Sequence, residues 1–248
     1  MPHTDMPLHR PRSWLPSVCQ VCGTWPSQAV CDNCLRDCAP DTPRCPRCGS
    51  SDGQGCGPCR HCWPSPSPLD AVWASVDYTY PWSGLIARFK FRQEVSWARV
   101  FAHIMLAPPQ ARTRLLDVDW LVPMPISPQR LAERGYHQAW ALTLALQQSL
   151  PANQRPGALP NALVRLSDGE HQHALPRGER WRNPHLRCVA HPDHASRLLD
   201  AHVLLIDDVC TTGASLHAAA QALRQAGAAR VSAWAFARTA HADADRPL

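Results

Sequence analysis

Short apolar runs alternate with longer amphipathic stretches between residues 70 and 238, and this alternation predicts an α/β fold. The apolar runs predict strands at residues 71–80, 121–126, 161–166, 186–189, 203–206 and 231–237. Helical patterns cover residues 83–107, as one long or two short helices, and residues 128–150 and 214–226. We therefore expect a parallel sheet with helices on both faces.

The segment at residues 203–215 joins an apolar run, two carboxylates, a loop of small residues and a predicted helix. The apolar run fits a strand covered on both faces, and Asp207 and Asp208 are predicted to follow at its carboxyl end, where open α/β sheets bind ligands. The start of the helix offers free N–H groups and the positive end of a helix dipole to a phosphate. The candidate phosphate-binding residues are Cys210, Thr211, Thr212, Gly213, Ala214 and Ser215.

This combination suits a sugar phosphate. Loop amides and hydroxyls can bind a 5′-phosphate, while the adjacent carboxylates accept hydrogen bonds from ribose hydroxyls. An acidic pair at the end of a strand can also simply cap the next turn. The ordered set of apolar run, Asp-Asp, Thr-Thr-Gly and Ser favours the phosphate site over this alternative.

Cysteine spacing near the amino terminus predicts a metal-binding module, because ten of the 12 cysteines lie between Cys19 and Cys62. The candidate zinc ligands form four Cys-x-x-Cys pairs: Cys19 and Cys22, Cys31 and Cys34, Cys45 and Cys48, Cys59 and Cys62. Sequential pairing would give two sites, although the spacing also permits crossed pairing. Cys38 and Cys56 are left over, and Cys56 forms a competing pair with Cys59. A redox dithiol is disfavoured because no βαβ pattern surrounds these cysteines. Four-thiolate shells leave no open position, so the expected role of Zn²⁺ is structural.

Composition narrows the class of protein. A hydrophobic content of 45% in 248 residues is typical of a folded chain. No apolar stretch approaches a membrane span and residues 1–17 lack the apolar region of a secretory signal, so we expect a cytoplasmic protein without membrane insertion. Binding of two Zn²⁺ by eight thiolates would lower the formal charge of +5 to about +1. Net charge is therefore weak support for nucleic-acid binding.

Basic residues elsewhere in the chain are candidates for a pyrophosphate group, because guanidinium binds phosphate oxygens in a bidentate manner. Arg130 and Arg134 follow the predicted strand at residues 121–126, although they also fit an ordinary solvated helix start. Arg180 lies in a donor-rich stretch, and Lys90 is the only lysine in the sequence.

The chain as a whole resembles the ComF/GntX family of bacterial phosphoribosyltransferase-like proteins, and residues 203–215 resemble the phosphoribosyl pyrophosphate (PRPP) signature of type I phosphoribosyltransferases. The motifs that carry the resemblance occur in the family's order: the paired cysteine knuckles, a Pro-rich junction, Asp70, Arg88-Phe-Lys90-Phe, Pro123-x-Pro125, Arg134-Gly-Tyr-His-Gln138, Gln172 to Asn183 and Asp207 to Gly213. His137 stands where the family more often has Asn.

The resemblance implies a type I phosphoribosyltransferase-like fold with an N-terminal double zinc ribbon, PRPP and Mg²⁺ as ligands, and a link to competence and DNA uptake. The expected divisions are an extension (1–18), the double zinc ribbon (19–63), a Pro/Ser linker (64–69), the phosphoribosyltransferase-like domain (70–238) and a tail (239–248).

Two hypotheses about function follow. As an enzyme, the protein would release pyrophosphate from C1 of the ribose, with Asp207 and Asp208 stabilising the cation-like carbon while Mg²⁺ and basic residues offset charge on the leaving group. As a binding protein, it would sense PRPP or reuse the pocket for single-stranded DNA or DNA-uptake partners. No motif specifies the acceptor or the oligomeric state.

Overall fold

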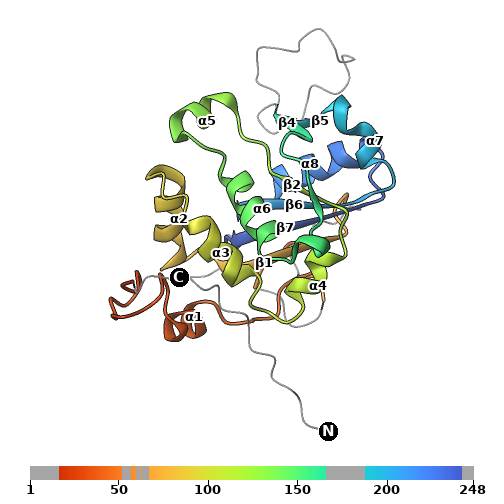
Figure 1. Ribbon diagram of the computed structural model, residues 1–248. Coiled ribbons are helices and arrows are strands. Elements are labelled where there is room, and N and C mark those ends of the chain that lie inside the picture. The colour runs from red at the N-terminus through yellow and green to blue at the C-terminus, as the bar shows by residue number, and fades with distance from the viewer. Residues whose placement is uncertain (1–16, 52–56, 60–61, 63–66, 166–187, 242–248) are drawn as a thin grey trace, which may run out of the picture.

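The structure is a computed structural model that describes residues 17–51, 57–59, 62, 67–165 and 188–241. Its centre is a five-stranded parallel sheet (Figure 1). In spatial order the strands are β1 (Ala71–Asp77), β7 (Arg230–Arg238), β6 (His202–Cys210), β2 (Trp120–Pro123) and β3 (Gly157–Ala158). The predicted parallel α/β sheet is thus confirmed.

Helices cover both faces of this sheet because the side chains of β6 alternate between two cores. Leu204 and Ile206 face one core, which is shared with α2 (Trp82–Phe91), α3 (Trp97–Met105) and α6 (Gln138–Gln148). Val203 and Leu205 face the other core, which is shared with α8 (Ala214–Gln225). Figure 1 shows α8 on the opposite side of the sheet from α2 and α3. All four of these β6 side chains are fully buried, as expected for a strand covered on both faces.

Strand β6 is longer than its apolar run predicts. It continues through Asp207 and Asp208 to Cys210 because its neighbour β7 continues beside it, with Asp207 opposite Ala235 and Cys210 opposite Arg238. Strand β2 on the other side ends at Pro123, opposite Ile206. The two acids therefore lie within the strand rather than after it, at the point where β6 loses one of its two neighbours.

The two long helical predictions are each divided. Gly135, at a left-handed φ of 75°, ends α5 (Pro128–Arg134), and α6 begins after His137, so the prediction of one helix over residues 128–150 is wrong. Gln93, at φ 55°, lies between α2 and α3, which confirms two short helices in residues 83–107.

The remaining elements are short. The predicted strands at residues 161–166 and 186–189 form an antiparallel pair, β4 (Leu163–Arg165) and β5 (Cys188–Ala190). Elements without a strong periodic signal are α1 (Asp32–Cys38), α4 (Ala111–Leu116), α7 (Ala195–Leu198), and the 3-10 helices η1 (Ala152–Gln154) and η3 (Pro192–His194).

The cysteine-rich segment packs directly on the α/β body. Cys19, Val30 and Cys34 belong to the same core as α2 and α3, and the indole Nε1 of Trp82 donates to the carbonyl of Cys38 at 2.6 Å. Farther along, the backbone N–H of Val72 in β1 donates to the carbonyl of Pro46 at 2.9 Å. The segment therefore contacts both a helix layer and the edge of the sheet.

Candidate functional site

The acid pair meets a cation from another element of the fold. Lys90 Nζ of α2 lies 3.0 Å from Asp208 Oδ1, and the backbone N–H of Asp208 donates to Asp207 Oδ1 at 2.9 Å. Asp208 is buried, and the Lys90 side chain is 20% exposed. The structure thus brings together Lys90, Asp207 and Asp208, three of the candidate residues from the sequence.

The surroundings of Asp207 favour its protonated form. Burial and the neighbouring charge of Asp208 raise the pKa of Asp207 to about 8, and the positive charge of Lys90 opposes this rise. Both influences therefore favour the neutral carboxyl of Asp207 over the carboxylate. A ligand that develops positive charge beside Asp207 would favour release of the carboxyl proton, which is the electrostatic role expected of a carboxylate facing a cation-like carbon.

The loop between β6 and α8 has the open backbone that an anion requires. Thr211 and Thr212 are exposed, and Gly213 precedes α8 with a left-handed φ of 84°, a conformation that favours glycine. The hydroxyl of Thr212 accepts a hydrogen bond from the N–H of Ala214 at 3.3 Å. In contrast, the Cys210 side chain is buried, so this residue has only its backbone to offer to a ligand. The N-terminus of α8 therefore faces an accessible turn.

The turn between α5 and α6 approaches the acids from a third direction. His137 Nε2 lies 2.9 Å from the carbonyl of Met124, just after β2, and burial lowers the pKa of His137 so that the neutral ring donates this bond. The hydroxyl of Tyr136 donates to the carbonyl of Phe89, next to Lys90. Burial, followed by the charge of Asp208, raises the pKa of Tyr136. The turn thus holds both α2 and the end of β2.

The predicted arginines are less closely associated with the acids. Arg134 Nη1 donates to Gln138 Oε1 at 3.0 Å, and its guanidinium lies 5.4 Å from the ring centre of Phe91. Arg130 is exposed on α5, which stands out from the sheet in Figure 1, and its backbone N–H is capped by Ser127 Oγ at 3.3 Å. Arg180, like the other donors between residues 172 and 183, lies outside the described residues.

The eight candidate metal ligands form two groups in sequential order. Cys19, Cys22, Cys31 and Cys34 form the first cysteine group, and Cys45, Cys48, Cys59 and Cys62 form the second cysteine group. Within each group the ligand atoms all lie within 4.8 Å of one another. A tetrahedral Zn²⁺ with Zn–S bonds of about 2.3 Å places its sulfurs roughly 3.8 Å apart, so both groups fit this ion. Sequential pairing is therefore the observed arrangement. Of the two remaining amino-terminal cysteines, Cys38 has no place in either group and Cys56 lies outside the described residues.

Within the cysteine groups some thiols have a lowered pKa and others a raised pKa, and a bound cation would favour the thiolate form of all of them. In the first, hydrogen bonds from the Thr24 side chain and backbone lower the pKa of Cys22 to about 6, whereas burial and the neighbouring thiols raise the pKa of Cys34. In the second, burial raises the pKa of Cys45, but hydrogen bonds from Cys62 and from the backbone of Cys59 outweigh it and bring the pKa to about 6. One thiolate is stabilised by its neighbours, but four thiolates at this range require a metal ion.

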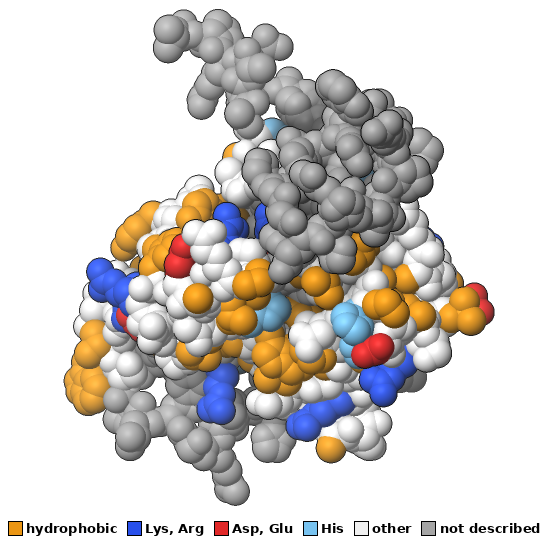
Figure 2. All heavy atoms as spheres, turned by 90° about the horizontal axis from the view of Figure 1, so that it is seen from above, with side chains coloured by type: hydrophobic (Ala, Val, Ile, Leu, Met, Phe, Trp, Pro, Cys, Tyr) orange, Lys and Arg blue, Asp and Glu red, His pale blue; other side chains and the backbone are white. Residues whose placement is uncertain are grey.

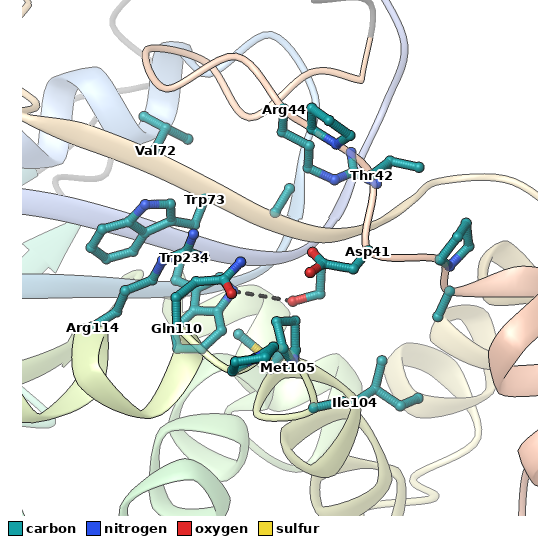
Figure 3. Close-up of a pocket in the computed structure, with 18 of the residues that line it drawn as sticks. Asp41, Thr42, Arg44, Val72, Trp73, Ile104, Met105, Gln110, Arg114 and Trp234 are labelled. Carbon is teal, nitrogen blue, oxygen red and sulfur yellow. Dashed lines mark hydrogen bonds between the residues drawn. The ribbon is translucent and has the colours of Figure 1, made fainter. Parts of the chain in front are cut away.

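A cavity among the described residues lies away from the acid pair. It has a volume of about 520 Å³ and lies between residues 39–46, β1 and the α3–α4 region (Figure 3). Arg114 lies over the ring of Trp73 at 5.0 Å, and burial lowers the pKa of Arg114 while the charge of Asp41 opposes this. None of the predicted ligand-binding residues lines this cavity. The candidate phosphate site is instead an open surface at the end of β6.

The charged side chains on one face of the protein show little sign of a broad nucleic-acid surface. On the face seen in Figure 2, Lys and Arg side chains of the described residues lie scattered among hydrophobic and uncharged groups instead of gathering into one stripe. Within the described ranges, helices of the length and hydrophobicity that crossing a bilayer requires are absent.

Sequence reasoning missed one residue at the phosphate loop. Arg238, only 2% exposed at the end of β7, donates through Nη1 to the carbonyls of Cys210 (3.2 Å), Thr211 and Thr239 (2.7 Å). The available signal was an arginine that directly follows the buried apolar run at residues 231–237. A charged residue at such a position is rarely buried without specific partners.

The amino-acid sequence is similar to a known protein family and to several named bacterial proteins. The family profile described as "phosphoribosyl transferase domain" matches residues 176–246, a range that contains the acid pair and the phosphate loop. The chain is 29% identical over 238 residues to "DNA utilization protein YhgH" of Escherichia coli (strain K12), covering 91% of this chain and 98% of that protein. It is 30% identical over 218 residues to "Competence protein F" of Haemophilus influenzae, covering 84% and 90%. "Competence protein ComFC" of Bacillus subtilis is 37% identical over 120 residues, covering 48% and 44%.

Proposed function

Because the chain belongs to the ComF/GntX family of phosphoribosyltransferase-like proteins, we propose that it binds PRPP at the end of β6 and transfers the phosphoribosyl group with release of pyrophosphate. The observation that carries this proposal is the placement of an acid pair, of which Asp208 is buried, directly before an exposed loop at a helix N-terminus. Asp207 and Asp208 precede Thr211 to Gly213 on one continuous segment, and Gly213 supplies the left-handed turn.

The ligand is assigned from the chemistry of each group. Backbone N–H groups and hydroxyls of residues 210–215 bind the 5′-phosphate, and the carboxylates of Asp207 and Asp208 accept hydrogen bonds from the ribose hydroxyls. Lys90, Arg130, Arg134 and Arg180 are assigned to the pyrophosphate by their charge, and Arg180 by its place in the sequence alone. Lys90 then exchanges its bond to Asp208 for a phosphate oxygen, which frees Asp208 for the ribose.

The proposed chemistry is substitution at C1 of the ribose. The bond between C1 and the pyrophosphate oxygen breaks, its electron pair leaves with pyrophosphate, and the acceptor forms the new bond to C1. Ionised Asp207 and Asp208 stabilise positive charge at C1, and the basic residues stabilise negative charge on the leaving group. Mg²⁺, when bound with PRPP, supplies further positive charge at the pyrophosphate.

Calorimetry with PRPP and Mg²⁺ tests the binding step. Wild type should bind, and the double variant Asp207→Asn with Asp208→Asn should lose at least about 100-fold in affinity, since two hydrogen bonds to charged acceptors are weakened. Asp193→Asn, at an exposed carboxylate on η3, is the matched control and should bind as wild type does. Absence of binding by the wild type would overturn the proposal. Binding without pyrophosphate release, followed by phosphorus NMR with base and amine acceptors, would limit the function to PRPP sensing.

The names of the relatives extend the proposal to a pathway. Proteins called "DNA utilization protein" and "Competence protein" support a role for this chain in DNA uptake or use. Direct binding of single-stranded DNA is the second candidate, although scattered surface charge gives it little support (Figure 2). That candidate predicts affinity that falls steeply with salt and is unchanged in the Asp207 and Asp208 variants, as measured by fluorescence anisotropy. Affinity that is insensitive to salt would contradict it.

A further inference from the structure

Arg238 connects two regions that are distant in the sequence, and it lies 190 residues from Cys48 itself. Its Nε donates to the carbonyl of Cys48 at 2.9 Å, whereas its Nη1 reaches the carbonyls of Cys210 and Thr211. Cys48 belongs to the second cysteine group, and Thr211 belongs to the candidate phosphate loop. One buried guanidinium thus holds the backbone of a metal knuckle and the backbone of the loop at the same time.

The second cysteine group and the loop also pack closely around this arginine. The crevice between them has a volume of only about 20 Å³ and is lined by residues from both sides, including Arg47, Cys48, Thr212 and Gly213. His241, just after β7, places Nε2 3.6 Å from Cys48 Sγ. The knuckle at Cys48 therefore packs against one side of the loop.

A guanidinium in this position couples the positions of the carbonyl groups that it binds. Because Arg238 is almost fully buried, loss of the Cys48 carbonyl would leave the Nε–H group without this acceptor in a region that excludes water. The planar fork fixes the relative directions of those carbonyls. If the knuckle shifts, either the bond to Cys48 breaks or the loop carbonyls move with the guanidinium.

The first cysteine group supplies an internal contrast. Its neighbours are on α2: Trp82 donates to Cys38, and Arg88 Nη1 donates to Gln20 Oε1 at 2.8 Å. Its four sulfurs offer the same chemistry as those of the second group, but the contacts of its segment lead to α2, the helix that carries Lys90.

We propose that Arg238 is a positioning residue through which the second cysteine group, when it holds its metal, fixes the conformation of the phosphate loop. Metal at this group therefore sets the affinity of the protein for the 5′-phosphate end of its ligand. The ligand part of this inference depends on the PRPP binding proposed above, whereas the coupling between knuckle and loop does not.

Hydrogen–deuterium exchange in the full-length, metal-loaded protein tests the coupling without any ligand. Arg238→Lys, and separately Cys45→Ser in the second group, should increase exchange of the amides at residues 209–214 by at least about tenfold, as expected for loss of a buried bidentate donor. Arg224→Lys is the matched control, because Arg224 also binds several carbonyls, of Pro68, Ala228 and Ala229, but outside the loop. Cys22→Ser in the first group controls for loss of one metal ion, with metal content measured by atomic emission.

Ligand fragments test which end of the site is affected. In Arg238→Lys and in Cys45→Ser, affinity for ribose 5-phosphate should fall by at least about tenfold, while affinity for Mg²⁺-pyrophosphate should stay unchanged. The double variant should lose no more than either single variant, because both interrupt the same connection. A general loss of stability would instead lower the affinity for both fragments, and the losses caused by the two substitutions would add.

Unchanged loop exchange in Arg238→Lys and Cys45→Ser would overturn the inference, as would an equal effect of Cys22→Ser. If Arg238→Lys does not fold, the comparison of Cys45→Ser with Cys22→Ser decides. If wild type binds neither PRPP nor ribose 5-phosphate, the proposed function fails, and the exchange data still judge the coupling.

Discussion

The two cysteine groups have the same ligand chemistry and different structural surroundings. Cys19 and Cys34 of the first group are buried in the same core as α2, α3 and α6. Three cysteines of the second group form a separate small core. Its backbone accepts a hydrogen bond from Val72 of β1 and another from the side chain of Arg238 in β7, which also binds the phosphate loop. The first group is thus part of the main hydrophobic core, and the second is attached at the edge of the sheet.

We therefore expect the first group to affect mainly the stability of the fold and the second group to affect mainly the geometry of the site. Displacement of the first group would disturb the side-chain packing under α2, the helix that carries Lys90. Displacement of the second would disturb the carbonyls around Arg238 while leaving the main core in place. The acid pair lies between the two supports, with Lys90 on one side and Thr211 to Gly213 on the other.

The largest expected effect is on global stability. Cys34→Ser should lower the free energy of unfolding by about 3 kcal/mol or more, because loss of a structural metal opens the main core, whereas Cys59→Ser should cost clearly less. Urea denaturation followed by far-ultraviolet circular dichroism measures both variants. Equal losses would remove the distinction between the two groups.

A smaller effect is expected at the contact between the first group and α2. Trp82→Phe keeps an aromatic ring in the core but removes the donor to Cys38, and the unpaired carbonyl should cost about 2 kcal/mol. Trp25→Phe, at an exposed ring, is the control and should change the same denaturation curve little. A neutral Trp82→Phe would show that this bond does not hold the module to α2.

The smallest effect concerns the acid pair between the two supports. Because burial and Asp208 raise the pKa of Asp207 from 3.8 to about 8, the neutral form favours the folded state. This contribution is complete below pH 4 and is lost as the pH rises towards 8. Asp207→Asn stays neutral, so between pH 7 and pH 8 it should lose roughly 1 kcal/mol less stability than wild type. Asp193→Asn should follow the wild-type pH profile in the same denaturation series; a parallel profile for Asp207→Asn would contradict the shift.

The order of neighbouring elements was the part that the sequence predicted well. The apolar run of β6, the acids, the Thr-Thr-Gly loop and the start of α8 are consecutive, so their order along the chain is also their order in space. The sequential grouping of the cysteines was one of two arrangements that the spacing allowed, and only the fold selected between them.

Features that depend on distant partners could not be predicted in this way. Strand β6 extends to Cys210 because β7 pairs with it up to that residue. The apolar run of a single strand does not indicate how far its neighbour extends. Arg238 and Cys48 are 190 residues apart, and Lys90 meets Asp208 only when α2 packs against the sheet. Gly135 was visible in the sequence, but its left-handed φ, which divides α5 from α6, depends on how the turn packs.

The bond between Val72 and Pro46 has a consequence for self-association. Strand β1 is an edge strand, and an uncovered edge offers unpaired backbone groups to the strands of other molecules. In this chain Pro46, between Cys45 and Cys48 of the second cysteine group, occupies part of that edge. A shift of this group away from β1 would therefore expose a template for intermolecular sheet formation.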